Sequence, residues 1–133
     1  MTYLLDTNVI SALMRADARM ASWLSLIGAD DRVAICTIGR GEILFGLERL
    51  APGRRRTDLE AKAGKLFAAL PCEPIPAAAG DRYAEVKISQ QRRGLPLDEN
   101  DLWIAATALA MDATLVSRDS DFQAIEGIAV VQP

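Results

Sequence analysis

Histidine is absent from this sequence of 133 residues. The absence excludes ribonuclease catalysis by histidine, serine–histidine triads, cysteine–histidine proteases and zinc sites with imidazole ligands. An enzyme of this composition has to work with carboxylates, lysines, hydroxyl groups or a hard metal ion.

Cysteine is scarce, and long apolar runs are missing. Cys36 and Cys72 both lie in apolar stretches of sequence, which argues against a disulfide framework and predicts free thiols in a reducing compartment. Asp6 and Asn8 interrupt the first apolar residues, so we expect no ordinary signal peptide, and no run approaches the length of a membrane span. We therefore expect a soluble, cytoplasmic protein with no membrane partner.

Positive charge is in slight deficit. The chain has 18 acidic and 15 basic residues, a net charge of −3 at pH 7, so no overall field attracts a polyanion. Binding to nucleic acid would need local basic patches or metal ions at an acidic site. Hydrophobic residues make up 50% of the chain and charged residues 25%, which is typical of a globular protein, and the length predicts one domain over residues 1–133.

Short apolar runs alternate with segments of helical spacing. We expect strands at 3–5, 33–37, 114–117 and 128–131, and a short extended piece at 73–76. We expect helices near 9–14, 20–27, 43–50, 57–70, 77–93 and 98–109, and a short one within 119–126. The alternation predicts a three-layer αβα domain of the α/β class, with a mainly parallel central sheet of about four to five strands.

Four acidic residues fall at expected junctions between strands and helices: Asp6, Glu42, Asp101 and Asp119. Asp6 ends the first strand, and Glu42 lies near the expected start of the helix after the second. Asp101 lies in the first turn of a helix, and Asp119 follows a strand. Because the carboxyl ends of parallel strands meet at one edge of a sheet, we expect the four carboxylates in one cleft.

Helix capping is the competing interpretation of each aspartate. Asp98 and Asp121 are best explained as caps, Asp121 for the short turn that follows it. Asp6 taken alone would also more often be a cap than a ligand. Capping explains Asp101 less well because Asp98 already serves that helix, and Glu42 stands in an otherwise apolar run.

Carboxylates gathered in one cleft repel each other and take up protons unless a positive charge compensates. With no histidine and few lysines nearby, the expected compensator is a divalent cation, and an all-oxygen site suits Mg²⁺ or Mn²⁺. Such ions orient a phosphodiester and generate hydroxide from bound water. Basic residues on the rim would contact the polyanion, although charge runs on helices are more often solvated faces. The rim candidates are Arg40, Arg54, Arg55, Arg56, Arg92, Arg93 and Arg118.

Four segments of the chain resemble, in order, those of a PIN domain, and more narrowly a VapC-type toxin of a bacterial toxin–antitoxin pair. They are residues 4–10 (LLDTNVI), 41–46 (GEILFG), 100–106 (NDLWIAA) and 117–122 (SRDSDF). The resemblance implies a metal-dependent endoribonuclease that uses Mg²⁺ or Mn²⁺ on single-stranded or loop RNA, such as tRNA or mRNA. It also implies a homodimer, and inhibition by a cognate VapB-like antitoxin whose C-terminal segment enters the acidic groove.

The resemblance also assigns roles by position. Asp6, Glu42, Asp101 and Asp119 correspond to the acidic quartet that serves catalysis and metal binding, with Asp121 as an accessory acid. Thr7 would hold a metal-bound water, and Asn8 would brace its loop by hydrogen bonds. The chain departs from many relatives at Gly39, where they carry a serine or threonine three residues before the helix acid.

Other families with an aspartate after the first strand fit less well. A phosphoaspartate enzyme of the haloacid-dehalogenase type needs a second aspartate where Asn8 stands. A receiver domain needs a lysine after a late strand, where this chain has Ser117 and Arg118. Two alternatives stay open: a PIN nuclease that is not a toxin and acts on other RNA or on DNA, and a non-catalytic PIN-like binding module, which the complete quartet disfavours.

Overall fold

The computed structural model describes residues 1–133, which form five strands, six α-helices and one short 3-10 helix. The strands are β1 (Thr2–Leu5), β2 (Arg32–Cys36), β3 (Cys72–Glu73), β4 (Thr114–Val116) and β5 (Val130–Val131). The helices are α1 (Thr7–Met14), α2 (Ala18–Ser25), α3 (Thr37–Glu48), α4 (Arg54–Ala69), α5 (Ala78–Arg92), α6 (Glu99–Ala110) and the 3-10 helix η1 (Ser120–Ala124).

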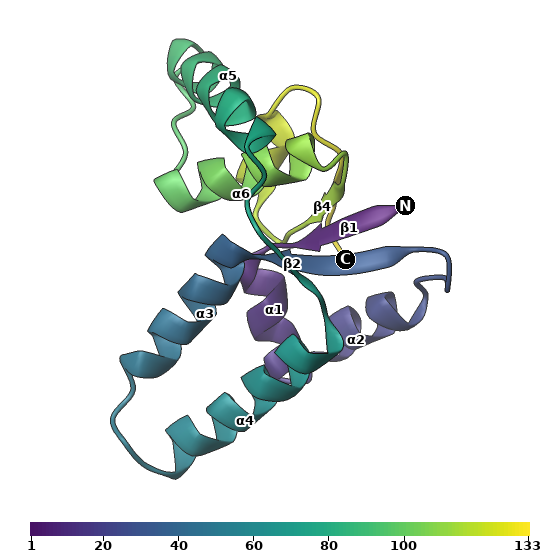
Figure 1. The fold of residues 1–133 in the computed structure, drawn as a ribbon, viewed down its shortest axis with the longest axis vertical. Coiled ribbons are helices and arrows are strands. Elements are labelled where there is room, and N and C mark those ends of the chain that lie inside the picture. The colour runs from purple at the N-terminus through teal and green to yellow at the C-terminus, as the bar shows by residue number, and fades with distance from the viewer.

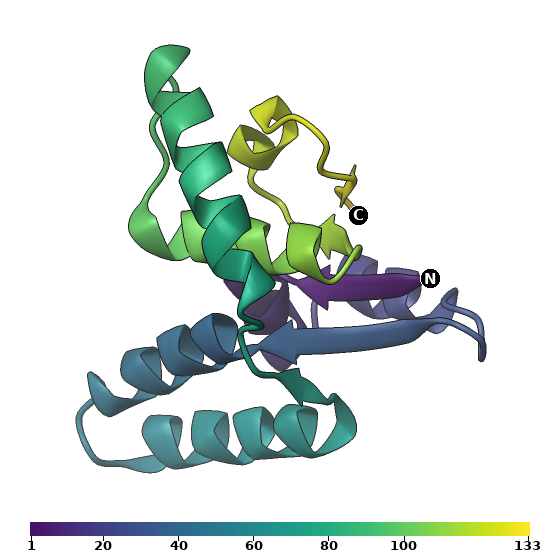
Figure 2. The same cartoon turned by 45° about the horizontal axis from the view of Figure 1, so that its top comes forward.

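The strands form one parallel sheet in the order β3-β2-β1-β4-β5. Helices α1 to α4 cover one face, and α5 and α6 cover the other (Figures 1 and 2). Because successive strand residues point to opposite faces, Leu4 joins the core under α5 and α6, whereas Leu5 joins the core under α1 to α4. The prediction of a three-layer α/β domain with a parallel sheet is confirmed.

The strand order reverses between β1 and β4. From β1 the chain proceeds outward to β2 and β3 and then crosses over to β4 and β5 on the other side. In open parallel sheets, ligands bind outside the carboxyl ends of the strands at such a switch point. Leu5 pairs with Val116 there, and the next residues of both strands, Asp6 and Ser117, begin the candidate site.

Two helix starts differ from the sequence prediction by three residues or more. We expected residue 37 in a strand and a helix from 43, but α3 begins at Thr37. The cap residue Cys36 makes no side-chain capping bond, so the sequence carries no start signal, and Thr37 is β-branched like a strand residue. Glu42 therefore lies in the middle of α3. Helix α4 begins at Arg54, three residues earlier than predicted.

The sequence prediction is right for the cap of α6 and wrong for the cap of η1. Asp98 caps α6 by accepting a hydrogen bond from the Asn100 N–H, as expected. The interpretation of Asp121 as a cap is wrong, because Asp119 caps η1 by accepting from the Asp121 N–H at 2.9 Å. Asp119 is thus both the acid of the predicted quartet and the cap.

Both cysteines are free thiols, as predicted, but their surroundings differ. Cys36 is buried in the sheet, whereas Cys72 is exposed. Cys72 lies on β3, which pairs with β2, and this edge position leaves its side chain open to solvent.

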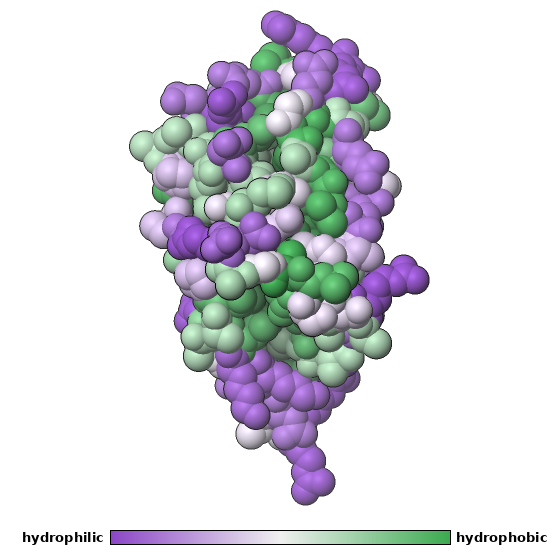
Figure 3. Space-filling view, turned by 90° about the vertical axis from the view of Figure 1, so that its right-hand side faces the viewer, coloured by the Kyte–Doolittle hydropathy of each residue, from purple (hydrophilic) through white to green (hydrophobic).

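Polar side chains cover the two ends of the molecule, and a more apolar band crosses its middle at the level of the sheet (Figure 3). The polar lower end in this view is where Figure 1 places the turn between α3 and α4. None of the helices has the length and apolar character needed to cross a membrane.

Candidate functional site

Asp6 stands at the centre of the site, between β1 and α1. It is only 4% exposed. Its Oδ1 accepts a hydrogen bond from the Thr7 N–H at 2.8 Å, and its Oδ2 accepts one from the Ser117 hydroxyl at 2.7 Å. Burial raises the pKa of Asp6 above its ordinary value, the two hydrogen bonds oppose that rise, and the charges of Glu42 and Asp119 add to it. Both carboxylate oxygens are therefore fixed in direction.

Ser117 is a buried hydroxyl that the sequence reasoning did not single out. Besides donating to Asp6, its Oγ accepts from the Asp119 N–H at 3.0 Å and from Asn8 Nδ2 at 3.4 Å. The only local signal is a hydroxyl residue directly after three buried strand residues and two positions before an acid. Ser117 ties the turn after β1 to the turn after β4.

Asn8 strengthens the same connection. Its Oδ1 accepts a hydrogen bond from the Arg118 N–H at 3.2 Å, while its Nδ2 donates to Ser117. The two turns are thus held together by side-chain bonds in both directions, which is the loop-bracing contact that the resemblance implied for Asn8.

Glu42 approaches Asp6 from α3 and is held by Thr7. The Thr7 hydroxyl donates a hydrogen bond of 2.6 Å to Glu42 Oε1, so the first residue of α1 fixes an acid on α3. One helical turn before Glu42, a side chain at Gly39 would meet Ile10 Cδ1 at 3.3 Å and come within 3.8 Å of Thr7 Oγ1. Because residue 39 is a glycine, α3 approaches α1 closely. The hydroxyl beside Glu42 is therefore supplied by Thr7 on α1 and not by residue 39.

Asp101 enters the site from the first turn of α6 and is half-buried. Burial is the largest cause that raises its pKa, to about 7. Neighbouring negative charges add to the effect, in the order Asp6, Asp98, Asp119 and Glu42. Asp101 thus lies within electrostatic reach of the other three acids of the predicted quartet.

Asp121 does not join this group. It is exposed on η1, and it is not among the charges that shift the pKa of Asp6 or Asp101. Its main-chain N–H serves Asp119, as described above.

The donors present fit a hard divalent cation. No three acidic or cysteine side chains are arranged to hold one metal ion between them. Mg²⁺ does not require such a cage, because it keeps several waters and usually takes one or two carboxylates together with substrate phosphates. The donor set is all oxygen, and the crowding that raises the pKa of Asp6 and Asp101 is what a cation would relieve.

Three of the seven predicted rim arginines, Arg40, Arg54 and Arg118, lie in different settings. Arg118 pairs with Asp17 at 2.8 Å, and Arg40 stacks its guanidinium over the Phe67 ring at 4.5 Å from the centroid. Arg54 takes part in no ion pair and lines a groove between α1, α3 and α4. Of these three arginines, only Arg54 is free of a partner and lines this groove.

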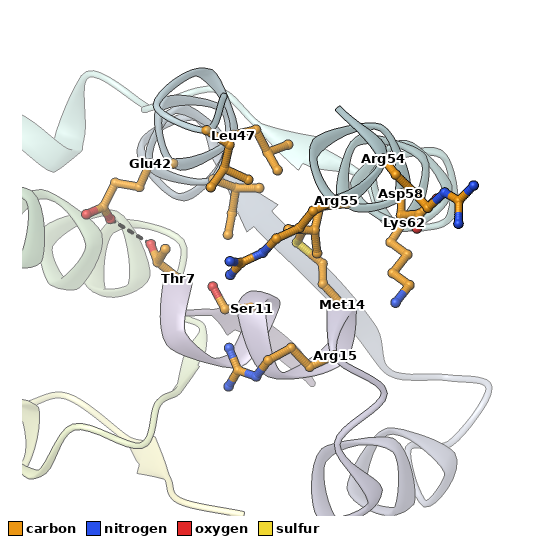
Figure 4. Close-up of a pocket in the computed structure, with 14 residues that line it drawn as sticks. Thr7, Ser11, Met14, Arg15, Glu42, Leu47, Arg54, Arg55, Asp58 and Lys62 are labelled. Atoms are coloured by element: carbon orange, nitrogen blue, oxygen red, sulfur yellow. Dashed lines mark hydrogen bonds between the residues drawn. The ribbon is translucent and has the colours of Figure 1, made fainter. Parts of the chain in front are cut away.

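This groove has a volume of about 820 Å³ and reaches the acidic site, since Thr7 and Glu42 line it (Figure 4). Its wall is apolar, formed by Met14, Ile43, Leu47, Leu50 and Leu59. Basic side chains surround the opening: Arg15, Arg54, Arg55 and Lys62.

The sequence as a whole matches a known domain. The PIN domain profile matches residues 3–128, a range that contains all four carboxylates. The chain belongs to the PIN-domain family. Its five-stranded parallel sheet matches the fold of this family, so the resemblance given by four short segments is confirmed over nearly the whole chain.

This PIN domain is similar to named toxins over its full length. Toxin FitB from Neisseria gonorrhoeae is 31% identical, covering 98% of this chain and 96% of that protein. VapC ribonuclease Y4jK from Sinorhizobium fredii is 29% identical, covering 97% and 95%. The structure of FitAcB from Neisseria gonorrhoeae superposes with a TM-score of 0.83 at 28% identity, covering 98% and 97%. VapBC2 from Rickettsia felis, bound to a promoter DNA fragment, shares the fold with a TM-score of 0.90 at 24% identity, covering 98% of each chain.

Proposed function

We propose that this PIN domain is a metal-dependent endoribonuclease toxin that cleaves single-stranded or loop RNA, such as tRNA or mRNA, in the cytoplasm. The observation that carries the proposal is the gathering of four acids at the switch point of the sheet: Asp6, Glu42, Asp101 and Asp119. Burial, and then the negative charges nearby, raise the pKa of Asp101 there to about 7. The names of the similar proteins, which include VapC ribonucleases, support the same reaction class.

Asp6 and Asp101 are the residues we propose to bind Mg²⁺ or Mn²⁺, with Glu42 and Asp119 completing the site. A bound divalent ion supplies a nucleophilic hydroxide at neutral pH and stabilises the departing oxygen of a phosphodiester.

The chain's own residues prepare the site for that chemistry. Ser117 and the Thr7 N–H hold both oxygens of Asp6, so this carboxylate loses no orientational freedom when it binds. The Thr7 hydroxyl keeps the Glu42 carboxylate turned toward α1, beside Asp6. Asp119 is held by its capping bond to η1. Pre-orientation of this kind lowers the cost of reaching the reactive arrangement.

An antitoxin and a second copy of the chain are the protein partners we propose. VapBC-5 from Mycobacterium tuberculosis, a similar structure, is a member of the VapBC family of toxin–antitoxin systems, which supports a VapB-like antitoxin for this chain. Leu44 and Phe45 on α3 are 40% and 62% exposed, and Phe45 borders a shallow cavity with Ile38 and Asn100. An apolar patch of this kind supports a homodimer. Sedimentation of the parent and of the Phe45→Ser variant tests whether this patch forms the dimer contact.

The function is tested by expression and by cleavage. We expect expression to arrest growth and co-expression of a small antitoxin encoded beside the gene to restore it. Purified protein should cut single-stranded RNA with Mg²⁺ or Mn²⁺. RNA binding without cleavage would instead identify a non-catalytic module, and cleavage of DNA in preference to RNA would identify a nuclease of another kind.

A further inference from the structure

We propose that Arg15 and Arg55 form a second anion site in the groove, which binds a phosphodiester of the RNA substrate next to the bond that is cut. The inference rests on the proposed ribonuclease function and names how the substrate is held. The two arginines come from different helices, since Arg15 is the C-cap of α1 and Arg55 lies in the first turn of α4.

The two side chains converge on one stretch of the groove wall. Figure 4 shows the Arg55 guanidinium reaching from α4 toward Ser11 on α1, and Arg15 extending back along α1 toward the same residue. Thr7 is one helical turn before Ser11 on α1, and it carries the bond to Glu42. An anion held between the two arginines would therefore lie beside the acidic site.

These arginines have no carboxylate partner. None of the seven ion pairs in the structure includes Arg15, Arg54, Arg55 or Lys62. Their neighbour Arg56, by contrast, pairs with Glu48 at 3.1 Å and with Glu60 at 3.0 Å. Asp58 is the only acid besides Glu42 that lines the groove. In a chain with a net charge of −3, four cations without an ion pair thus line the groove that leads to the carboxylates.

Arg55 stands where it weakens its own helix. The positive end of a helix dipole is at the N-terminus, so cations in the first turn are unfavourable. Helix α4 begins with three arginines, has no acid in its first turn, and has Gly53 as a cap without a side-chain bond. Residues that break a local rule of stability are most often placed for function. A bound anion would compensate the unfavourable positive charge at the start of α4.

A phosphodiester fits this site better than other anions. The planar guanidinium presents paired N–H donors that match phosphate oxygens. An acidic protein that cuts a polyanion needs such contacts away from the metal. Contacts to phosphates do not depend on the base sequence of the RNA. The apolar wall formed by Met14, Leu47 and Leu59 offers an unstacked base a place to pack beside the phosphate.

The test compares two double variants with equal net charge. Arg15→Gln/Arg55→Gln removes the proposed site, and Arg19→Gln/Lys65→Gln removes two exposed cations from α2 and α4 that belong to no ion pair and do not line the groove. The probe is a fluorescein-labelled, random-sequence, single-stranded RNA of about a dozen nucleotides, a length in the range of single-strand sites. Fluorescence anisotropy is measured in excess chelator, over a range of salt concentrations.

We expect the groove variant to bind RNA about tenfold more weakly. The slope of its plot of log affinity against log salt should flatten by about 0.7, the value for one lost phosphate contact on a single strand. The control variant should stay within about twofold of the parent. With Mg²⁺, the groove variant should show a raised KM at a nearly unchanged kcat, because its contacts lie away from the reacting bond.

If the parent cleaves RNA and the groove variant binds RNA with the same affinity and salt slope as the parent, this inference is overturned and the proposed function stands. A parent that neither binds nor cleaves RNA would overturn both. If the groove variant kept its RNA affinity but lost affinity for the antitoxin, the two arginines would bind a protein acid and not the substrate. An unchanged thermal midpoint of both variants verifies that the comparison is between folded proteins.

Discussion

The hydroxyl of Ser117 donates a hydrogen bond of 2.7 Å to Asp6 Oδ2 across 111 positions of sequence. The bond joins the ends of β1 and β4, the two strands between which the sheet order reverses. Both groups are buried, so the acid at the centre of the site depends on a donor that lies far from it in the chain.

Replacement of Ser117 by alanine should weaken both folding and metal binding. The change leaves the buried Asp6 carboxylate short of a donor, which costs about 1–3 kcal/mol of unfolding free energy. Loss of a residue that orients a metal ligand typically lowers metal affinity about 10- to 100-fold. We expect a lower thermal midpoint and weaker Mn²⁺ binding by calorimetry. Ser22→Ala, on exposed α2 surface, is the control, and Mn²⁺ binding equal to that control would contradict the role of Ser117.

Thr7→Val should reduce cleavage while the fold is preserved. Valine has nearly the shape of threonine but lacks the hydroxyl that holds Glu42 Oε1 at 2.6 Å. The Glu42 carboxylate would then sample several directions, and we expect kcat to fall about tenfold or more with little change in KM. Thr57→Val on the exposed face of α4 is the matched variant. Equal kcat in the two valine variants would show that the Thr7–Glu42 bond is not used.

Asp101 should make the metal-free protein less stable as the pH rises. Its carboxyl group titrates near 3.8 when unfolded and near 7 in the fold, so between these values the folded state binds more protons. The stabilising contribution of Asp101 to the free energy of unfolding is complete below the pKa of the unfolded state. It falls as the pH rises and is gone above about pH 7. Because the group is half-buried, solvent screening reduces the effect to on the order of 1 kcal/mol.

The measurement is the thermal midpoint in excess chelator between pH 4 and pH 8, for the parent and for Asp101→Asn. Asparagine has the same shape and no charge, so the fall of the midpoint with pH should be smaller in this variant, and its midpoint at pH 8 higher than that of the parent. Asp30→Asn, exposed before β2, controls for the loss of one negative charge. Parallel curves for parent and Asp101→Asn would show that the cluster does not strain the fold.

The two thiols should react at very different rates. Cys72 is exposed, whereas burial raises the pKa of the Cys36 thiol and removes it from solvent. Titration of native protein with a thiol reagent should therefore modify one cysteine rapidly and the second only after unfolding. Cys72→Ser should abolish the rapid phase. A rapid phase that survives this substitution would mean that Cys36 is reached without unfolding.

The sequence predicts those parts of the fold that have a local signal. The apolar run before Asp6 and the cap at Asp98 are visible in a few residues, and the structure has β1 and α6 there. Helix α3 begins at Thr37 without a side-chain cap, so nothing in the sequence announces it. An extended piece was expected at 73–76, but strand β3 is Cys72–Glu73. Its bounds are set by pairing with β2, which a pattern of side chains does not reveal.

The same limit applies to the site. Asp6, Asp101 and Asp119 could be predicted because they stand at junctions between elements. Glu42 lies in the middle of α3 and could be predicted only as an acid within an apolar run. The charges of the other three acids all act on Asp101. Ser117 was missed because its partners lie elsewhere in the chain. The arginines could not be sorted from sequence, since only the fold shows that Arg118 pairs with Asp17 while Arg54 and Arg55 face the groove.

The central claim is that the four carboxylates act through a divalent cation to cut RNA. Its most direct test is cleavage of single-stranded RNA by protein stripped with chelator, before and after Mg²⁺ or Mn²⁺ is added, for the parent and for Asp101→Asn. We predict no cleavage without metal, cleavage by the parent when metal is restored, and a loss on the order of 10²-fold or more in the variant, comparable to removing a catalytic electrostatic group. Persistent cleavage by the stripped protein, or a well-folded Asp101→Asn variant that cuts RNA at the parent's rate, would contradict the account.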